Sequence, residues 1–203
     1  MRLFAAVEIG ETLAAQAAEV SRELQRRAGD AAPRAKVTWV PADRLHLTVR
    51  FIGEVDDAKG QAVCAALRPA LAVSAFDLTL HGAGAFPKGG SPRVLWIGVT
   101  GGREALLAIE REITSRLTPL GIEDEDRAYS PHLTLARVRE PAGLRSARLL
   151  EGLTDRDIGT TRVDAITLFQ SKLSPKGPTY TPLLRTSLKV AGGSGQVAGG
   201  SSW

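Results

Sequence analysis

Cysteine is almost absent from this sequence: Cys64 is the single copy, so the chain cannot form an internal disulfide. No apolar run is long enough to cross a bilayer. The first residues meet a charged side chain, Glu8, too early for a secretory signal peptide. No glycine-rich loop has the lysine and hydroxyl spacing of a phosphate-binding P-loop. These absences argue against a disulfide-stapled secreted domain and against a helical membrane protein. They predict a soluble cytoplasmic protein.

Charge and composition are close to ordinary. The 203 residues are 43% hydrophobic and 24% charged, which fits one globular domain or two small interlocked lobes. The formal net charge is +4. A mildly basic protein suits a polyanionic ligand but does not require one.

Histidine is scarce, and two of the three copies lie in a repeated motif. His46-Leu47-Thr48-Val49 recurs in the second half of the chain as His132-Leu133-Thr134-Leu135. Both runs are typical of β-strands, in which side chains alternate between faces. Histidine and threonine therefore share one face, and the aliphatic residues share the other. The repeat predicts two half-domains whose histidine-threonine faces meet across a cleft.

A pair of histidines suits acid-base catalysis near neutral pH. Imidazole titrates near pH 6.5, so one ring can accept a proton while the other donates one. A hydroxyl beside each ring can donate to a phosphate oxygen and stabilise developing charge. Zinc usually takes three or four protein ligands, and no third ligand has a fitting spacing, so no metal ion is expected. His81 has no threonine two positions on, and no role is assigned to it.

The remaining pattern mixes strands and helices without regular alternation. It predicts an α+β fold of antiparallel sheets covered by helices. Residues 1–190 form the expected domain, and the Gly/Ser-rich residues 191–203 form an expected flexible tail. Strands are predicted at Leu3–Val7, Val37–Val40, Phe76–His81, Arg93–Val99, Val163–Leu173 and Tyr180–Val190, and a loop at Gly82–Pro92. Helices are predicted at Leu13–Leu24 (ending near Gly29), Val63–Leu71 (capped by Asp56), Leu106–Leu117 and Leu144–Leu150.

The two motifs and several further segments resemble one known family. The supporting segments are Arg2–Val7, Trp39-Val40, Phe86-Pro87, Arg93–Val99, Tyr129-Ser130-Pro131 and Gly177–Tyr180. Together they resemble the 2H phosphoesterases, specifically the RNA 2′,3′-cyclic phosphodiesterases, which are also called 2′-5′ RNA ligase-like or LigT-like proteins. One departure is Glu8-Ile9-Gly10, where members of this family often carry a proline.

The resemblance implies a bilobal, pseudo-symmetric fold with a central cleft that carries both motif strands. It implies metal-independent hydrolysis of a terminal 2′,3′-cyclic phosphate to a 2′-phosphate. His46 matches the general acid and His132 the general base, while Thr48, Thr134 and Arg137 match phosphate-contacting residues. The implied partners are RNA with 2′,3′-cyclic phosphate ends or small cyclic-phosphate nucleotides. No cofactor and no membrane are implied, and a monomer is expected.

The sequence alone does not decide which arginine, Arg50 or Arg137, reaches the cleft. Strict alternation puts Arg137 on the apolar face of its strand, unless the strand ends, twists or bulges. Arg50 alternates onto the His46 face, and Phe51 onto the apolar face, but Arg50 belongs to a less specific position of the motif.

Two other functions compete with hydrolysis. One is a non-catalytic RNA- or nucleotide-binding module, although a binder has no need for two titrating groups. The other is reversible 2′-5′ RNA ligation, which would have to proceed by reversal of an RNA transesterification because no nucleotide-activation motif is present.

Overall fold

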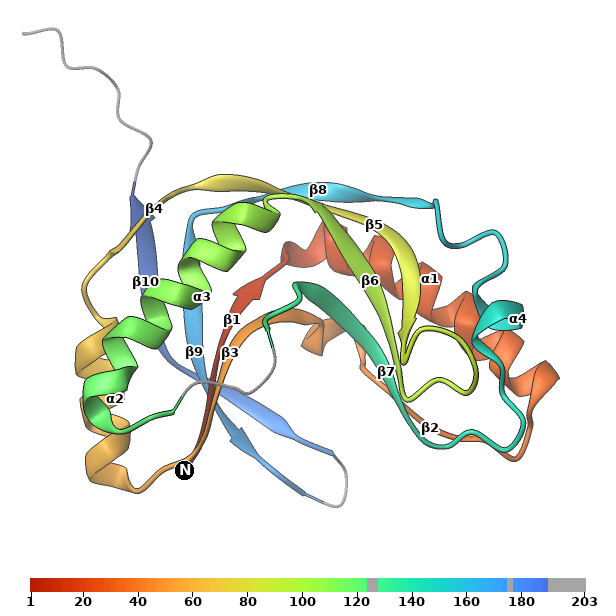
Figure 1. Ribbon diagram of the computed structural model, residues 1–203, viewed down its shortest axis with the longest axis horizontal. Helices are drawn as coiled ribbons and strands as arrows, with labels where there is room; N and C mark the ends of the chain where they lie inside the picture. The colour runs from red at the N-terminus through yellow and green to blue at the C-terminus, as the bar shows by residue number, and fades with distance from the viewer. Residues whose placement is uncertain (124–127, 175–176, 190–203) are drawn as a thin grey trace, which may run out of the picture.

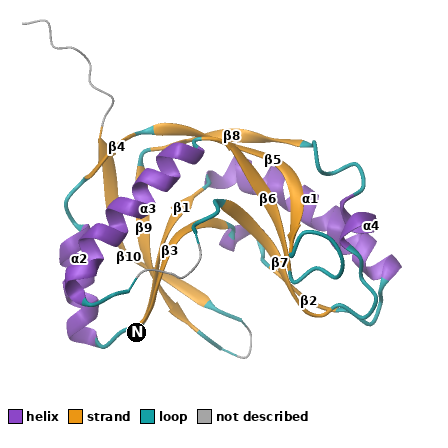
Figure 2. Ribbon diagram, in the orientation of Figure 1, coloured by secondary structure: helices purple, strands orange, loops and turns teal. Residues whose placement is uncertain are grey.

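The computed structural model describes residues 1–123, 128–174 and 177–189 of the chain. These residues form ten strands, four α-helices and two 3₁₀ turns, arranged as two curled five-stranded sheets with helices packed against them (Figures 1 and 2). The α+β prediction is confirmed. The predicted tail, 191–203, lies outside the described residues.

Each sheet contains one of the two motif strands. The first sheet has the order β3 (His46–Glu54), β1 (Arg2–Glu8), β9 (Ala165–Lys172), β10 (Thr179–Lys189) and β4 (Leu71–Ser74). The second has the order β2 (Lys36–Trp39), β7 (His132–Glu140), β6 (Val94–Gly101), β5 (Phe76–Phe86) and β8 (Asp157–Val163). Neighbouring strands are antiparallel except β10 and β4. The pair β1–β3 thus corresponds to the pair β6–β7, as the duplicated motif predicts.

The two long helices cross between the halves. Helix α1 (Gly10–Ala31) follows β1 but packs against β8 and β7 of the second sheet, while α3 (Arg103–Leu117) follows β6 but packs against β4 and β3 of the first. Figure 1 shows α3 beside β4 and α1 behind β6. Two shorter helices, α2 (Asp57–Leu67) and α4 (Ser146–Leu150), lie at opposite ends of the molecule. Because each half covers the other, neither half can bury its apolar face alone.

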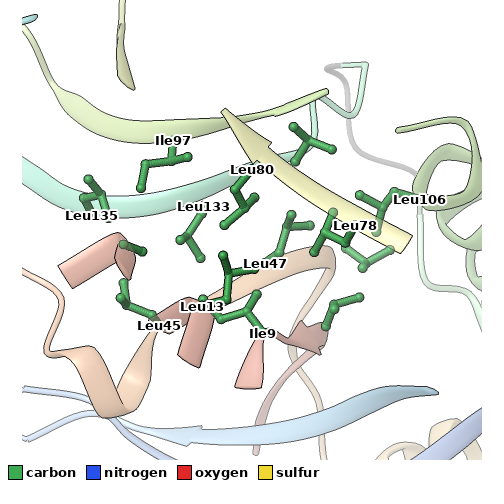
Figure 3. Packing of buried hydrophobic residues seen from close by; sticks show 14 of the residues in the cluster. Ile9, Leu13, Leu45, Leu47, Leu78, Leu80, Ile97, Leu106, Leu133 and Leu135 are labelled. Atoms are coloured by element: carbon green, nitrogen blue, oxygen red, sulfur yellow. The ribbon is translucent and has the colours of Figure 1, made fainter. Parts of the chain in front are cut away.

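The aliphatic backs of both motif strands enter one common core. Leu47 of β3 and Leu133 of β7 are fully buried, together with Leu80 and Ile97 from β5 and β6 (Figure 3). Burying a leucine side chain stabilises a fold by about 1.5–3 kcal/mol. The core therefore fixes which face of each strand points away from it, and that face carries histidine and threonine.

Several predicted boundaries are wrong. Gly29 does not end α1, which continues to Ala31 and has its C-cap at Ala32. Leu71 belongs to β4, because α2 ends at Leu67, although the Asp56 cap is confirmed by its bond from the Lys59 amide at 2.7 Å. Strand β5 continues into the predicted loop as far as Phe86, and strand β8 was not predicted.

Candidate active site

A β-bulge interrupts each motif strand at the same position. In β7, Thr134 pairs with Trp96 and Ala136 pairs with the adjacent Leu95, so Leu135 is an extra residue. In β3, Thr48 pairs with Ala6 and Arg50 with Ala5, so Val49 is the equivalent extra residue. A bulge resets the alternation of side chains beyond it. The burial patterns of the two strands agree residue by residue through the seventh position.

The bulge decides which arginine faces the cleft. Arg137, the second residue after the extra one, is exposed on the side of His132 and Thr134, as the resemblance implies. Its counterpart in β3 is Phe51, which is 48% exposed and lines the same groove. The predictions that Phe51 faces the core and that Arg50 faces the cleft are therefore wrong, because both assumed strict alternation.

Arg50 points into the molecule instead. It is only 3% exposed, and its Nη1 lies 3.4 Å from Oε1 of Glu110 on α3. Its Nη2 donates to the Glu123 carbonyl at 2.6 Å. Thr114 Oγ1 donates to the same Glu110 oxygen at 2.9 Å. Arg50 thus ties β3 to α3 and to the segment that follows α3.

Both motif histidines are oriented in the same way. Nδ1 of His46 lies 2.8 Å from the Arg44 carbonyl, and Nδ1 of His132 lies 2.7 Å from the Ser130 carbonyl. A carbonyl can only accept, so Nδ1 carries a proton in each ring and donates it. The titrating nitrogen of each ring is therefore Nε2, which is available for proton transfer to or from a substrate.

Aromatic side chains enclose each imidazole. The His46 ring centroid lies 5.0 Å from that of Phe4 and 5.1 Å, edge-on, from that of Tyr180. The His132 centroid lies 5.3 Å, edge-on, from that of Phe86. Burial lowers the pKa of both histidines below the ordinary value.

Two charged neighbours modify these pKa values in opposite directions. The Glu8 carboxylate raises the pKa of His46, and the Arg137 guanidinium lowers that of His132. In each case burial is the larger effect. The neighbours nevertheless make the two rings electrostatically unequal.

Three adjoining hollows form one groove along these residues. The central hollow, of about 570 Å³, contains His46, and the His132 hollow, of about 390 Å³, contains His132. These two hollows share Thr48, Thr134, Arg137 and Phe51, so both hydroxyls and the guanidinium lie between the two imidazoles. The outer hollow, of about 520 Å³, extends past His46 on its far side. Every predicted site residue therefore lines one continuous groove.

A tyrosine links the two halves at this groove. The Tyr129 hydroxyl, three residues before His132, donates to the Thr48 carbonyl at 3.0 Å. Burial raises the pKa of Tyr129 well above its ordinary range, so the hydroxyl keeps its proton and remains a donor. The bond connects the segment leading into β7 to the backbone of β3.

His81 lies apart from the groove. Its Nδ1 is 2.8 Å from Oδ1 of Asp157, which pairs β5 with the edge strand β8.

Within the described ranges 1–123, 128–174 and 177–189, no group of three or more His, Cys, Asp or Glu residues could hold a metal ion. Likewise, no helix in this part of the chain is long and apolar enough to cross a membrane.

Several groove residues were not predicted as site residues. Phe4, Tyr180 and Arg44 reach the groove from three separate elements. The pairings of β3 with β1, β1 with β9 and β9 with β10 bring the two aromatics to His46. Glu8 was noted in the sequence as an early charged residue and as part of a departure from the family pattern, but not as a groove residue. The register of β1 against β3 would have been needed to place it opposite His46.

Comparison with known proteins identifies relatives along most of the chain. Residues 13–174 match the model of the 2′-5′ RNA ligase superfamily. An Aeropyrum pernix protein named RNA 2′,3′-cyclic phosphodiesterase is 36% identical over 154 residues, which are 75% of this chain and 87% of that protein. A Thermotoga maritima protein of the same name is 32% identical over 90% of this chain and 93% of its own length.

Solved structures extend the likeness to the fold. The crystal structure of E. coli LigT complexed with 3′-AMP is 28% identical, covers 92% of this chain and 97% of its own, and has a TM-score of 0.67. That of TT0787 of Thermus thermophilus is 28% identical, covers 95% of this chain and all of its own, and has a TM-score of 0.68.

Proposed function

The chain belongs to the 2′-5′ RNA ligase superfamily, the 2H phosphoesterases, and from that premise we propose that it is an RNA 2′,3′-cyclic phosphodiesterase. It opens the cyclic phosphate at an RNA end, or in a small nucleotide, to a 2′-phosphate. The observation that carries the proposal is the single groove in which both histidine-threonine pairs and Arg137 meet. A non-catalytic binding module gives no reason for two imidazoles held in the same tautomer beside that groove.

The reaction needs one proton taken up and one delivered. Nε2 of neutral His132 accepts a proton from water as the water oxygen attacks phosphorus. The bond between phosphorus and the 3′ oxygen breaks, and Nε2–H of protonated His46 delivers its proton to that oxygen. Exchange with solvent then restores both rings. A positioned acid or base of this kind typically accelerates a reaction by roughly 10²- to 10⁴-fold.

The electrostatics of the groove support this division of roles. The Glu8 carboxylate favours the protonated form of His46, which the acid requires, and Arg137 favours the neutral form of His132, which the base requires. The reverse assignment would oppose both neighbours.

The threonines and Arg137 serve the phosphoryl group. Thr48 and Thr134 lie between the two rings, and a hydroxyl from each side can donate to a non-bridging oxygen. Arg137 can form charge-assisted hydrogen bonds with the same group. Donors fixed in place before the reaction stabilise the charge that develops in the transition state.

This chemistry uses no metal ion and no second subunit. Two imidazoles supply both proton transfers, and all the groove residues come from one chain. We therefore propose that the protein acts as a monomer. We further propose that its substrate is RNA and that it acts in the cytoplasm.

An assay with 2′,3′-cyclic CMP and a cyclic-phosphate oligonucleotide tests the function. The wild type should release 2′-phosphate products at the same rate with and without EDTA. His46→Ala and His132→Ala should each slow turnover by roughly 10²- to 10⁴-fold. Their double variant should lose less than the product of these factors, because the two rings act in one transition state. The matched control, His81→Ala, should behave like the wild type. A rate that collapses with EDTA, or an active His132→Ala enzyme, would refute the mechanism.

A further inference from the structure

Glu8 stands directly opposite His46 in the first sheet. The two residues are partners in the antiparallel ladder of β1 and β3, so their side chains project to the same side. Both line the outer hollow. Thr167 of β9 donates its hydroxyl to Glu8 Oε2 at 2.6 Å, which holds the carboxylate in place. The Nδ1 atom of His46 is already bonded to a backbone carbonyl, so Glu8 acts on the ring through space.

The second half of the molecule lacks this carboxylate. The residue opposite His132 in the ladder of β6 and β7 is Gly98, which has no side chain. A second difference lies beyond the bulge, where Arg137 stands in β7 and Phe51 in β3. The duplicated halves thus differ at two matched positions, with an anion opposite His46 and a cation on the strand of His132.

We propose that Glu8 is a positioning residue that favours the proton-donating form of His46, so that this carboxylate biases two similarly held histidines toward different roles. The inference rests on the proposed function. It adds to that function a residue whose charge acts on the proposed acid.

Other charged groups surround His46, and of the two anions among them, Glu8 and Asp43, Glu8 is the ladder partner of His46. The outer and central hollows beside the ring are lined by these charged or titratable side chains: Arg2, Glu8, Asp43, Arg44, Arg137 and Tyr180. The carboxylate of Glu8 opposes the effect of burial on the pKa of His46. Because Glu8 is exposed, its effect is screened by salt.

The decisive variant is Glu8→Gln, which keeps the shape of the side chain and an oxygen for Thr167. Loss of the carboxylate lets the pKa of His46 fall further. In a pH profile of kcat/KM, the alkaline limb, where the acid loses its proton, should move to lower pH while the acidic limb stays in place. Near neutral pH the rate should fall by far less than the roughly 10²-fold expected from loss of the acid itself. Glu8→Asp should restore most of the wild-type profile, and added salt should shrink the difference between Glu8→Gln and wild type.

A spectroscopic titration separates this inference from the function on which it rests. The chain has three histidines, so their ring resonances can be assigned with single variants and followed by NMR in the absence of substrate. In Glu8→Gln the midpoint of His46 should move to lower pH, and that of His132 should not. Glu54→Gln is the matched control, because it removes an exposed carboxylate from the far end of the same strand pair, opposite Arg2.

Three results would overturn the inference. They are an unchanged His46 midpoint in Glu8→Gln, an equal shift in Glu54→Gln, or movement of the acidic limb instead of the alkaline one. The last result would mean that His46 is the base. A wild type that does not hydrolyse cyclic phosphates would refute the proposed function, whereas an active wild type with a profile insensitive to Glu8 would refute this inference alone.

Discussion

Arg50 and Arg137 should respond to substitution in opposite ways, because the bulges place one in the interior and the other in the groove. Arg50→Met removes one partner of an ion pair whose other member, Glu110, has a side chain only 14% exposed. Breaking a buried pair in this way costs about 3–5 kcal/mol of stability. We expect the lower end, since Glu110 keeps its bond from Thr114 and some contact with water. For a chain of this size 1 kcal/mol corresponds to roughly 2–4 °C, so the Tm should fall by about 6–12 °C.

Arg137→Met should leave the fold intact and impair the reaction. Arg137 is exposed, and surface substitutions usually change stability by less than about 0.5 kcal/mol, or 1–2 °C in Tm. A hydrogen bond to a charged group contributes about 1.5–3 kcal/mol. Loss of that bond to the phosphoryl group should lower kcat/KM roughly 10- to 150-fold.

Thermal denaturation gives the Tm, and hydrolysis of 2′,3′-cyclic CMP at a temperature well below the Tm gives kcat/KM. Both are measured on the same preparations. Glu110→Gln added to Arg50→Met should restore part of the lost stability, because it removes the carboxylate left without its arginine. An Arg50→Met enzyme with normal Tm and a large loss of kcat/KM would show that Arg50 faces the groove. That result would refute the bulge as the reason for the arrangement.

Two further predictions concern the pH range and the link between the halves. Burial lowers the pKa of both His46 and His132. Both limbs of the kcat/KM profile should therefore lie below the ordinary pKa of imidazole, with a maximum below about pH 6.5. The limbs belong to the coupled pair, and a maximum above about pH 7.5 would contradict the enclosed rings. Tyr129→Phe removes the donor to the Thr48 carbonyl and should lower stability by about 1 kcal/mol. It should reduce kcat more than it raises KM, since a small displacement of a catalytic group is costly; an unchanged kcat would show that this bond does not position the groove.

The sequence places the two histidine-threonine pairs correctly because their signal is local. Alternation over three residues puts His46 with Thr48 and His132 with Thr134, and the structure has both pairs facing the groove. The signal fails at the bulge, since the extra residue Leu135 is defined by its pairing with β6 rather than by its neighbours in the chain. Periodicity within one strand holds no information about the register of the next strand.

The loop predicted over the end of β5 was wrong because its glycines were interpreted as loop residues. Gly84 looks like a loop residue, but a Cβ atom there would lie 2.2 Å from Cη2 of Trp96. The residue is therefore small so that the indole ring of β6 can lie across the strand, and it does not end the strand. Gly82 has a φ of +69° and is the residue that is skipped in the pairing with β6. Strand β8 was missed because it is a half-exposed edge strand rich in polar residues, without a clear apolar stripe.

Hydrolysis and 2′-5′ ligation need the same placement of the two histidines, so the nucleophile decides between them. In the proposed mechanism His132 would take a proton from the group that attacks phosphorus, and His46 would protonate the departing 3′ oxygen, in either reaction. Water is the attacking group in hydrolysis, and a 5′-hydroxyl of a second RNA would replace it in ligation. At about 390 Å³, the His132 hollow is within the usual size range of small-ligand pockets, so sterics alone do not exclude the second RNA. Among the described residues that line this hollow, Arg137 is the one cation, and in the proposed mechanism it binds the phosphoryl group at the reaction centre. A second RNA would therefore gain little phosphate binding there, whereas water needs no binding site, and this imbalance favours hydrolysis.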